Sequence, residues 1–267
     1  MIHAVSGQKR PRYAGAVPDL ILLRHGQSTW NELNLFTGWT DVDLTPRGES
    51  EARSAGDLLA AEGDLDLRIL HTSVLTRAIR TAEITLHAAG RSWLPVRRNW
   101  RLNERHYGDL TGKDKKETAD QFGLEQVQLW RRSYDVPPPP LAEADPRSSL
   151  ADPRYRDVPG EFIPATECLK DVVARVTPYF ADVIIEDLRS EAVRGGAVIV
   201  VAHGNSIRAL RMVLQNIPED EIAQLEIPTG IPYRVTLDDG LNILSADYLG
   251  DPAAAAAAAD AVARQAG

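Results

Sequence analysis

Two histidines in this sequence directly follow apolar runs of the kind that form buried strands. Leu20 to Leu23 lead into Arg24-His25-Gly26, and Ala197 to Ala202 lead into His203-Gly204. Continuous runs of Leu, Ile and Val are typical of parallel strands covered on both faces. Ligands of open α/β sheets bind beyond the carboxyl ends of strands, so neighbouring strands would bring both imidazoles into one crevice beside an arginine. That combination suits phosphoryl transfer through histidine.

Each of these chemical interpretations has a structural alternative. A histidine after a strand is often a packed core residue. Arg77, which we place at the start of a helix after a strand, belongs either to a solvated helix face or to an anion site at the helix N-terminus. Glu104 is either a general acid and base or the partner of Arg101 or Arg105 in a salt bridge.

A group of basic residues follows Glu104. It comprises Lys113, Lys115, Lys116, Arg131 and Arg132. Such residues in helical regions normally coat a solvent surface. The adjacent arginines stand between Trp130 and Tyr134, however, and are equally suited to clamp a carboxylate and a second phosphate.

The composition is that of a globular enzyme. The chain has 267 residues, of which 43% are hydrophobic and 25% charged, and a net charge of −8, which argues against nucleic acid or an anionic membrane as the main partner. With one cysteine, Cys168, the chain cannot form an internal disulfide, which fits a reducing cytoplasm, and we expect this residue to be a buried helix residue. No apolar stretch is long enough to span a bilayer.

Strands and helices alternate along the chain. This order predicts an α/β fold with one domain and a mainly parallel central sheet that has helices on both faces. Beyond the two histidine-bearing strands, we expect a helix capped by Thr45 with Pro46 at its first position, a strand at 68–71, a helix capped by Ser73 that runs to about Ala89, an edge strand near 96–102 and one long amphipathic helix over 169–188.

Three segments depart from this regular pattern. Residues 1–18 lack the apolar core of a signal peptide, and we expect a disordered N-terminal extension before a catalytic domain at 19–250. The stretch from Pro137 to Pro164 is rich in turn signals and reads as a long loop. Residues 251–267 include seven consecutive alanines. Alanine favours helix, but few side chains here can anchor one, so we expect a mobile tail.

Six motifs together resemble a known family. They are Leu22-Leu23-Arg24-His25-Gly26-Gln27-Ser28, Phe36-Thr37-Gly38-Trp39, Arg101-Leu102-Asn103-Glu104-Arg105-His106-Tyr107-Gly108, Trp130-Arg131-Arg132, Ala202-His203-Gly204-Asn205-Ser206 and Ile227-Pro228-Thr229-Gly230-Ile231-Pro232. They are similar to the signatures of the cofactor-dependent phosphoglycerate mutases in the histidine phosphatase superfamily. The resemblance covers about residues 19 to 252.

The resemblance implies interconversion of 2-phosphoglycerate and 3-phosphoglycerate, primed by 2,3-bisphosphoglycerate without a metal, in glycolysis and gluconeogenesis. It makes His25 the phosphorylated nucleophile, Glu104 the proton donor and acceptor and His203 the stabiliser of the transferring group, with Arg24 and Arg77 as catalytic cations. The implied substrate-binding set is Arg24, His25, Gly26, Gln27, Ser28, Thr29, Trp30, Asn31, Thr37, Gly38, Arg77, Glu104, Arg105, His106, Tyr107, Lys115, Arg131, Arg132, Gly204 and Asn205.

Other aspects of the sequence leave alternatives open. Asp109 stands where the family pattern has alanine, and we expect its negative charge to weaken substrate binding or alter specificity. A phosphatase of the same superfamily would transfer the phosphoryl group from His25 to water. A non-catalytic phospho-ligand binding module would need neither Glu104 nor both histidines. Homo-oligomerisation also stays open.

Overall fold

The central element of the protein is a twisted sheet of six strands. A computed structural model describes residues 17–142 and 144–263, and its strands stand in the order β3-β2-β4-β1-β5-β6. The first four of these are parallel to one another, β5 is antiparallel to β1, and β6 is antiparallel to β5, which confirms the mainly parallel sheet. Their bounds are β1 (Asp19–Arg24), β2 (Leu67–Thr72), β3 (Val96–Arg98), β4 (Ala197–Ala202), β5 (Tyr233–Leu237) and β6 (Ile243–Tyr248).

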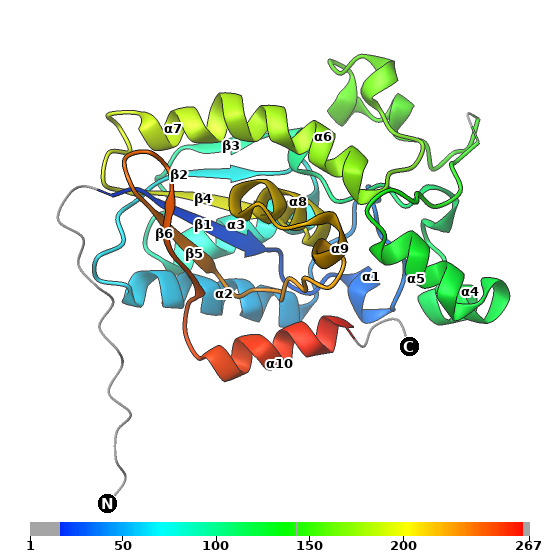
Figure 1. The fold of residues 1–267 in the computed structure, drawn as a ribbon, viewed down its shortest axis with the longest axis horizontal. Helices are drawn as coiled ribbons and strands as arrows, with labels where there is room; N and C mark the ends of the chain where they lie inside the picture. Colours follow the sequence, from blue (N-terminus) through cyan, green and yellow to red (C-terminus); the bar gives the residue numbers. More distant parts are fainter. Residues whose placement is uncertain (1–16, 143, 264–267) are drawn as a thin grey trace, which may run out of the picture.

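Helices cover both faces of the sheet (Figure 1). Their bounds are α1 (Thr29–Glu32), α2 (Pro46–Ala61), α3 (Thr76–Ala88), α4 (Lys115–Phe122), α5 (Leu124–Arg132), α6 (Leu169–Tyr179), α7 (Ile185–Arg189), α8 (Gly204–Gln215), α9 (Glu219–Ile222) and α10 (Pro252–Ala263). Helices α2 and α3 lie on one face, and α6, α7 and α8 lie on the other. No helix in the described part of the chain is long and apolar enough to cross a membrane.

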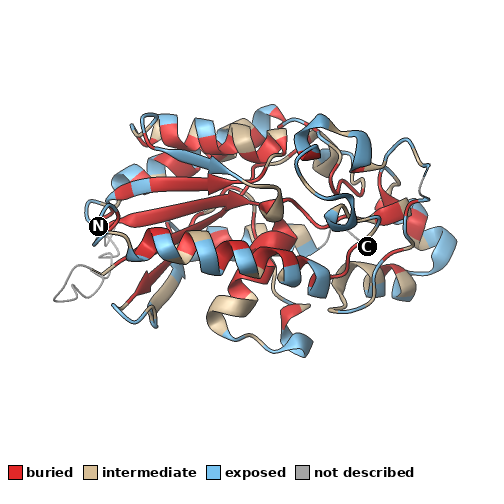
Figure 2. Ribbon diagram, turned by 90° about the horizontal axis from the view of Figure 1, so that it is seen from above, coloured by how far each residue is buried: buried red, intermediate tan, exposed pale blue. Residues whose placement is uncertain are grey.

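The alternation of side chains along β1 explains the two cores. Leu20 and Leu22 pack with residues of α6 and α8, whereas Ile21 and Leu23 pack with residues of α2 and α3. Figure 2 shows the resulting band of buried residues through the central strands. Because both faces are covered, a continuous apolar run rather than an alternating one specifies this strand.

Helix α2 begins as its sequence predicts. The Thr45 hydroxyl accepts a hydrogen bond from the Gly48 amide, and Pro46 occupies the first helical position. The start predicted for α3 is wrong, because Leu75 rather than Ser73 is the N-cap residue. The Asp41 carboxylate, from a loop distant in sequence, accepts hydrogen bonds from the Thr76 amide and hydroxyl and so caps the start of α3.

Two further predicted elements are interrupted. The run at 96–102 is an edge strand only to Arg98, and residues 100–102 form a 3₁₀ turn. The predicted helix over 169–188 is wrong as a single α-helix, since a π-helical turn at Phe180–Ile184 separates α6 from α7. Pro178 lies inside α6, just before this π-helical turn, and has no N–H to donate to the carbonyl of Ala174.

The predicted irregular segment between Pro137 and Pro164 is confirmed. Apart from residue 143, it consists of turns, including short 3₁₀ turns at 149–151, 153–155 and 160–162. Buried Tyr155 ties it to the fold, because its hydroxyl accepts a bond from Asn103 Nδ2 at 2.8 Å and its ring packs on Trp39. Because Asn103 directly precedes Glu104 in the sequence, this hydrogen bond fixes the loop beside Glu104.

The structure describes only part of each end of the chain. Most of the predicted N-terminal extension, residues 1–16, lies outside the described residues. In the C-terminal segment, residues 252–263 form helix α10, so the helix propensity of alanine prevails over the scarcity of anchoring side chains. Asp251 caps it through its carboxylate, and Ala255 is buried. Residues 264–267 are not described.

Candidate active site

The two histidines that follow β1 and β4 lie side by side. These strands are parallel neighbours with Arg24 opposite Ala202, and the His25 amide donates to the Ala202 carbonyl at 2.9 Å. Both imidazoles are buried, and their ring centroids are 4.9 Å apart. The predicted pairing of the two strand ends is therefore confirmed, and it places two imidazoles in one crevice.

The hydrogen bonding of His25 leaves one ring nitrogen free. Nδ1 lies 2.7 Å from the carbonyl oxygen of Gly26, which can only accept, so Nδ1 carries the proton. Burial, and then the charges of Arg77 and Arg24, hold the pKa of His25 well below its usual value. At neutral pH the ring is therefore uncharged and presents an Nε2 lone pair.

Gly26 serves the packing of the crevice floor. A β-carbon at this position would lie 2.2 Å from the carbonyl oxygen of Gly48 at the start of α2, so no larger residue fits. The Gly26 amide also donates to Thr81 Oγ1 on α3. The lack of a side chain at Gly26 therefore lets the turn after β1 pack closely against the first turn of α2.

His203 contacts Ser73, the residue that directly follows β2. Its Nε2 lies 2.8 Å from Ser73 Oγ, which also accepts a bond from the Leu75 amide. Burial, followed by the charges of Arg77 and His25, keeps the pKa of His203 well below its usual value. Ser73, predicted as a helix cap, thus contacts the second histidine instead.

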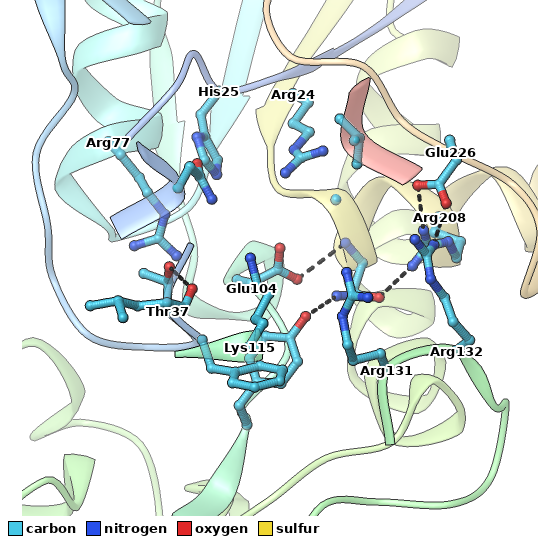
Figure 3. Close-up of a pocket in the computed structure, with 17 residues that line it drawn as sticks. Arg24, His25, Thr37, Arg77, Glu104, Lys115, Arg131, Arg132, Arg208 and Glu226 are labelled. Carbon is cyan, nitrogen blue, oxygen red and sulfur yellow. Dashed lines mark hydrogen bonds and ion pairs between the residues drawn. The ribbon is translucent and has the colours of Figure 1, made fainter. Parts of the chain in front are cut away.

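Two buried arginines, Arg77 and Arg24, lie on either side of His25 (Figure 3). Arg77 is 1% exposed, and its two Nη atoms donate to the carbonyls of Thr40 and Gly38. Arg24 donates through Nη1 to the carbonyl of Ile227. The Nε of each has no hydrogen-bond partner. Burial lowers the pKa of Arg77 to about 10, so it remains charged at pH 7.

Glu104 lies across the crevice, with its carboxylate held by backbone amides. Its Oε1 accepts from the amides of Arg105 at 2.7 Å and Asn205 at 3.1 Å. Burial alone would raise the pKa of Glu104, but the Arg105 amide and the Arg24 charge outweigh it, and the net pKa is below the usual value. The group is therefore ionised at pH 7.

The backbone of Glu104 is also anchored. Its carbonyl accepts from Trp39 Nε1 at 2.6 Å and from Arg175 Nη2 at 2.9 Å. Arg175 in turn forms a buried ion pair with Glu167. These bonds fix the position of the carboxylate. Its Oε1 is occupied by two amides, whereas its Oε2 accepts no hydrogen bond from the described residues, as expected of a proton carrier rather than of a salt-bridge partner.

The outer wall of the crevice is basic and comes from α4 and α5. Burial, and next the charge of Arg131, lower the pKa of Lys115 to about 7. Arg131 has an unpartnered buried Nη1, whereas Arg132 pairs with Glu226 at 2.5 Å. Both arginines therefore line the crevice, as the interpretation of a ligand clamp requires.

The predicted site residues divide into two groups. Those that line the pocket are Arg24, His25, Asn31, Thr37, Arg77, Glu104, Tyr107, Lys115, Arg131, Arg132, Gly204 and Asn205. The others, which are not among the lining residues, are Gly26, Gln27, Ser28, Thr29, Trp30, Gly38, Arg105, His106 and His203. Some of these bond to a lining residue, since the carbonyls of Gly26 and Gly38 accept from His25 and Arg77. His106 does not: it accepts from the Gly108 amide and donates its own amide to Glu167.

Ser28 shows how such support works. Its hydroxyl caps α1 by accepting from the Asn31 amide, and its own amide and hydroxyl approach Asn31 Oδ1 at 3.1 and 2.9 Å. These contacts occupy the Asn31 carbonyl oxygen. The Asn31 Nδ2 group is the part that can serve a ligand.

Several lining residues were not predicted as site residues. They are Leu35, Phe36, Arg208, Glu226 and Val262. Arg208 had a sequence signal, because it stands three residues after Asn205 on the same helix and so on the same face. Glu226 directly precedes the motif at Ile227. Val262 is brought to the pocket by α10, and its sequence context of alanines gave no indication of this.

Asp109 does not add its charge to the pocket. Its carboxylate pairs with Lys113 and Arg147, each at 2.7 Å, and it is not a lining residue. These two cations lower the pKa of Asp109. The expected weakening of substrate binding by this residue therefore has no support in its position.

Comparisons with known proteins identify the family. The family model of the histidine phosphatase superfamily (branch 1) matches residues 20–152 and 143–246. The chain is 57% identical over 246 residues to the 2,3-bisphosphoglycerate-dependent phosphoglycerate mutase of Nitratidesulfovibrio vulgaris (Miyazaki F), covering 92% of this chain and 97% of that one. It is 56% identical over 249 residues to the protein of the same name from Mycobacterium tuberculosis, with the same coverage.

Solved structures share the fold at lower identity. A mycobacterial glucosyl-3-phosphoglycerate phosphatase in complex with VO3 has a TM-score of 0.63 at 23% identity, over 86% of this chain and 96% of that chain. YhfR of Bacillus stearothermophilus has a TM-score of 0.62 at 25% identity, over 85% and 94%. The chain thus belongs to branch 1 of the histidine phosphatase superfamily and, within it, to the family of 2,3-bisphosphoglycerate-dependent phosphoglycerate mutases.

Proposed function

We propose that the protein interconverts 2-phosphoglycerate and 3-phosphoglycerate through a phosphohistidine, primed by 2,3-bisphosphoglycerate, in glycolysis and gluconeogenesis. The observation that carries this proposal is the pairing of a neutral His25 with an ionised Glu104 in one pocket lined by cations. A β-carbon at Gly204 would lie 3.6 Å from both Arg24 Cζ and Glu104 Oε2, so the nucleophile's neighbour and the carboxylate share one small space.

His25 is the nucleophile in this scheme. Its Nε2 attacks phosphorus, the bond from phosphorus to the substrate oxygen breaks, and the ring becomes phosphorylated while the Gly26 carbonyl holds Nδ1–H in place. Arg24 and Arg77 offer unpartnered Nε–H groups to the phosphoryl oxygens. His203 lies beside the ring and stabilises charge on the transferring group.

Glu104 moves the proton. When the free hydroxyl of a monophosphoglycerate attacks phosphorylated His25, Glu104 accepts the hydroxyl proton, the N–P bond breaks and the imidazole returns to its neutral form. When His25 next takes the other phosphoryl group, the leaving oxygen recovers that proton from Glu104. Each cycle therefore regenerates phosphorylated His25 and ionised Glu104, and the bisphosphorylated compound is the intermediate within the turnover.

The outer residues bind the remainder of the ligand. Lys115, Arg131 and Arg132 supply cations for the carboxylate and second phosphate, with Arg105 behind them, its guanidinium over the Tyr107 ring. Thr37 and Asn31 add neutral hydrogen-bonding groups. In this scheme the arginines provide the positive charge of the site, and we expect turnover to persist in the presence of a metal chelator.

Two further properties belong to this proposal. We place the enzyme in the cytoplasm, with a small phosphorylated glycerate as its partner rather than nucleic acid or membrane. We also propose that the described part of the predicted tail, residues 251–263, acts as a mobile cover of the site. Val262 on α10 lines the pocket, and six α10 or adjoining residues face a cavity toward α2 instead of packing tightly on it: Gly250, Asp251, Ala254, Ala258, Ala261 and Val262.

A coupled assay tests the proposed function. Conversion of 3-phosphoglycerate to 2-phosphoglycerate is followed through dehydration to an absorbing product, with and without added 2,3-bisphosphoglycerate. We expect turnover that rises on addition of the bisphosphate. Release of inorganic phosphate from 3-phosphoglycerate without isomerisation would instead identify a phosphatase that transfers from His25 to water.

A further inference from the structure

The side-chain amide of Asn205 is contacted from two sides. Arg208 Nη1 donates to the Asn205 Oδ1 at 2.6 Å, and the Asn205 Nδ2 donates to the Tyr107 hydroxyl at 3.4 Å. Asn205 stands in the first turn of α8, and Arg208 stands one turn further along the same face. The amide is thus held between a guanidinium on one side and the pocket on the other.

The chemistry of Arg208 decides which end of the amide faces the pocket. A guanidinium has only donors, so the group that meets it must be the amide oxygen. The Nδ2–H groups are then directed toward the pocket. With the amide reversed, two sets of donors would face each other, and a carbonyl oxygen would face the anionic ligand.

Arg208 is itself fixed in position. It is buried, its Nε donates to the Leu225 carbonyl at 2.9 Å, and its Nη2 lies 3.8 Å from Glu226 Oε2. Arg132 neutralises the same glutamate at 2.5 Å. The guanidinium therefore cannot turn away from Asn205 without breaking contacts to the segment that joins α9 to β5.

We propose that Arg208 is a positioning residue that sets the orientation of the Asn205 amide, so that the donor end of Asn205 faces the anionic ligand. The inference rests on the proposed function, in which Asn205 contacts a phosphoryl group. In this proposal, Arg208 affects the ligand through the side chain of Asn205 and not through its own charge.

A double-mutant cycle tests this role. Arg208→Met, Asn205→Ala and the combined variant are compared for KM and kcat with 3-phosphoglycerate and for the Kd of inorganic vanadate. Because a hydrogen bond to an anion is lost when the amide is free to reverse, we expect Arg208→Met to raise KM and the vanadate Kd by about tenfold. On the Asn205→Ala background the same change should alter both by less than about twofold.

Arg211→Met is the matched control. Arg211 is on the same helix and equally buried, but its guanidinium lies over the Tyr233 ring and neither residue lines the pocket. We expect this variant to lose thermal stability, as the removal of a buried arginine does, while KM and the vanadate Kd stay near their original values. A parallel loss of affinity in the control would reduce the effect at Arg208 to general destabilisation.

The outcomes are separable from those of the proposed function. An equal effect of Arg208→Met with and without Asn205 would overturn the inference, because it would show direct action of the arginine's charge on the ligand. So would an unchanged vanadate Kd. If the unaltered enzyme binds vanadate but does not isomerise 3-phosphoglycerate, the proposed function fails, whereas the vanadate cycle still decides the role of Arg208.

A measurement on the unaltered protein covers the case in which Arg208→Met does not fold. Neutron diffraction from deuterium-exchanged crystals with bound vanadate locates the deuterium atoms on the Asn205 amide. We expect two deuterium atoms on the atom that faces the vanadate and none on the atom next to Arg208. The reverse arrangement would contradict the inference.

Discussion

The inner and outer halves of the pocket are built differently. In the inner half, His25, His203 and Arg77 are almost fully buried and are bonded to the carbonyls or side chains of elements around the sheet. In the outer half, Lys115 and Arg132 come from the short helices α4 and α5, which come after the edge strand β3 in the sequence. Arg132 is one-fifth exposed, and it is paired with the carboxylate of Glu226.

This difference separates two tasks. The inner residues are held in one arrangement before the ligand arrives, which is what a group-transfer step requires, since reorganisation during the reaction would add to its barrier. The outer residues carry cations whose charge state or pairing is still adjustable, which suits binding and release of two similar ligands. We therefore expect substitutions in the inner half to change kcat and those in the outer half to change KM.

The largest effect is expected at His25. Replacement by alanine removes the atom that receives the phosphoryl group, and turnover in the coupled assay should fall to the background rate. His87→Ala changes an exposed histidine on α3 and should retain full turnover. Substantial activity in His25→Ala would move the nucleophile elsewhere in the inner half.

Glu104→Gln should have the next largest effect. It keeps the size of the side chain but removes the proton-accepting site, so kcat should fall by roughly 10²-fold with little change in KM. Stopped-flow measurement of His25 phosphorylation by 2,3-bisphosphoglycerate should show a slower step. Rates within twofold of the original enzyme would return Glu104 to a structural role, while Glu117→Gln, at an exposed position on α4, serves as the control.

Lys115 should make binding sensitive to pH. Burial lowers its pKa to about 7, so the unliganded pocket loses this cation as the pH rises through 7, and the apparent affinity for 3-phosphoglycerate should fall by about tenfold between pH 7 and pH 9. In Lys115→Arg the cation persists over this range. A KM profile that is equally steep in the variant would assign the titration to another group.

Removal of the C-terminal helix tests whether the outer half excludes water. A chain that ends at Gly250 should keep the fold, since only one of the described residues of α10, Ala255, is buried. Mutase turnover should fall severalfold, and hydrolysis of 2,3-bisphosphoglycerate should rise relative to it. An unchanged ratio of the two rates would mean that α10 does not protect phosphorylated His25.

The smallest effect is expected at Asp109. Because Lys113 and Arg147 already neutralise its half-exposed carboxylate outside the pocket, Asp109→Ala should change KM by less than about twofold. The loss of two surface ion pairs should lower the free energy of unfolding by no more than about 1 kcal/mol. A large fall in KM would revive the interpretation that this charge opposes ligand binding.

The same division describes how far the sequence could be interpreted. The inner half could be predicted from the sequence. Apolar runs that end in His25 and His203 indicate neighbouring parallel strands, and the ends of such strands lie together. Ser73 was misassigned as a helix cap, because Asp41, 35 positions before Thr76 in the sequence, binds the Thr76 amide at the start of α3. Local patterns do not report such long-range substitutions.

The outer half was harder to predict. The placement of Val262 against the pocket depends on where α10 crosses the molecule, and a run of alanines carries no periodic signal for this. Glu226 was missed because its role comes from a contact with Arg132, 94 positions away, and a single acidic residue in a loop is by default solvated. The π-helical turn was missed because apolar spacing continues through it.

The central claim is that His25, and not its neighbour His203, carries the phosphoryl group. The direct measurement is brief incubation with radiolabelled 2,3-bisphosphoglycerate, followed by proteolysis under alkaline conditions and mass spectrometry of the labelled peptide. We predict an acid-labile, base-stable phosphate on the peptide that contains His25, absent from His25→Ala. Label on the peptide that contains His203, or normal labelling of His25→Ala, would contradict the account.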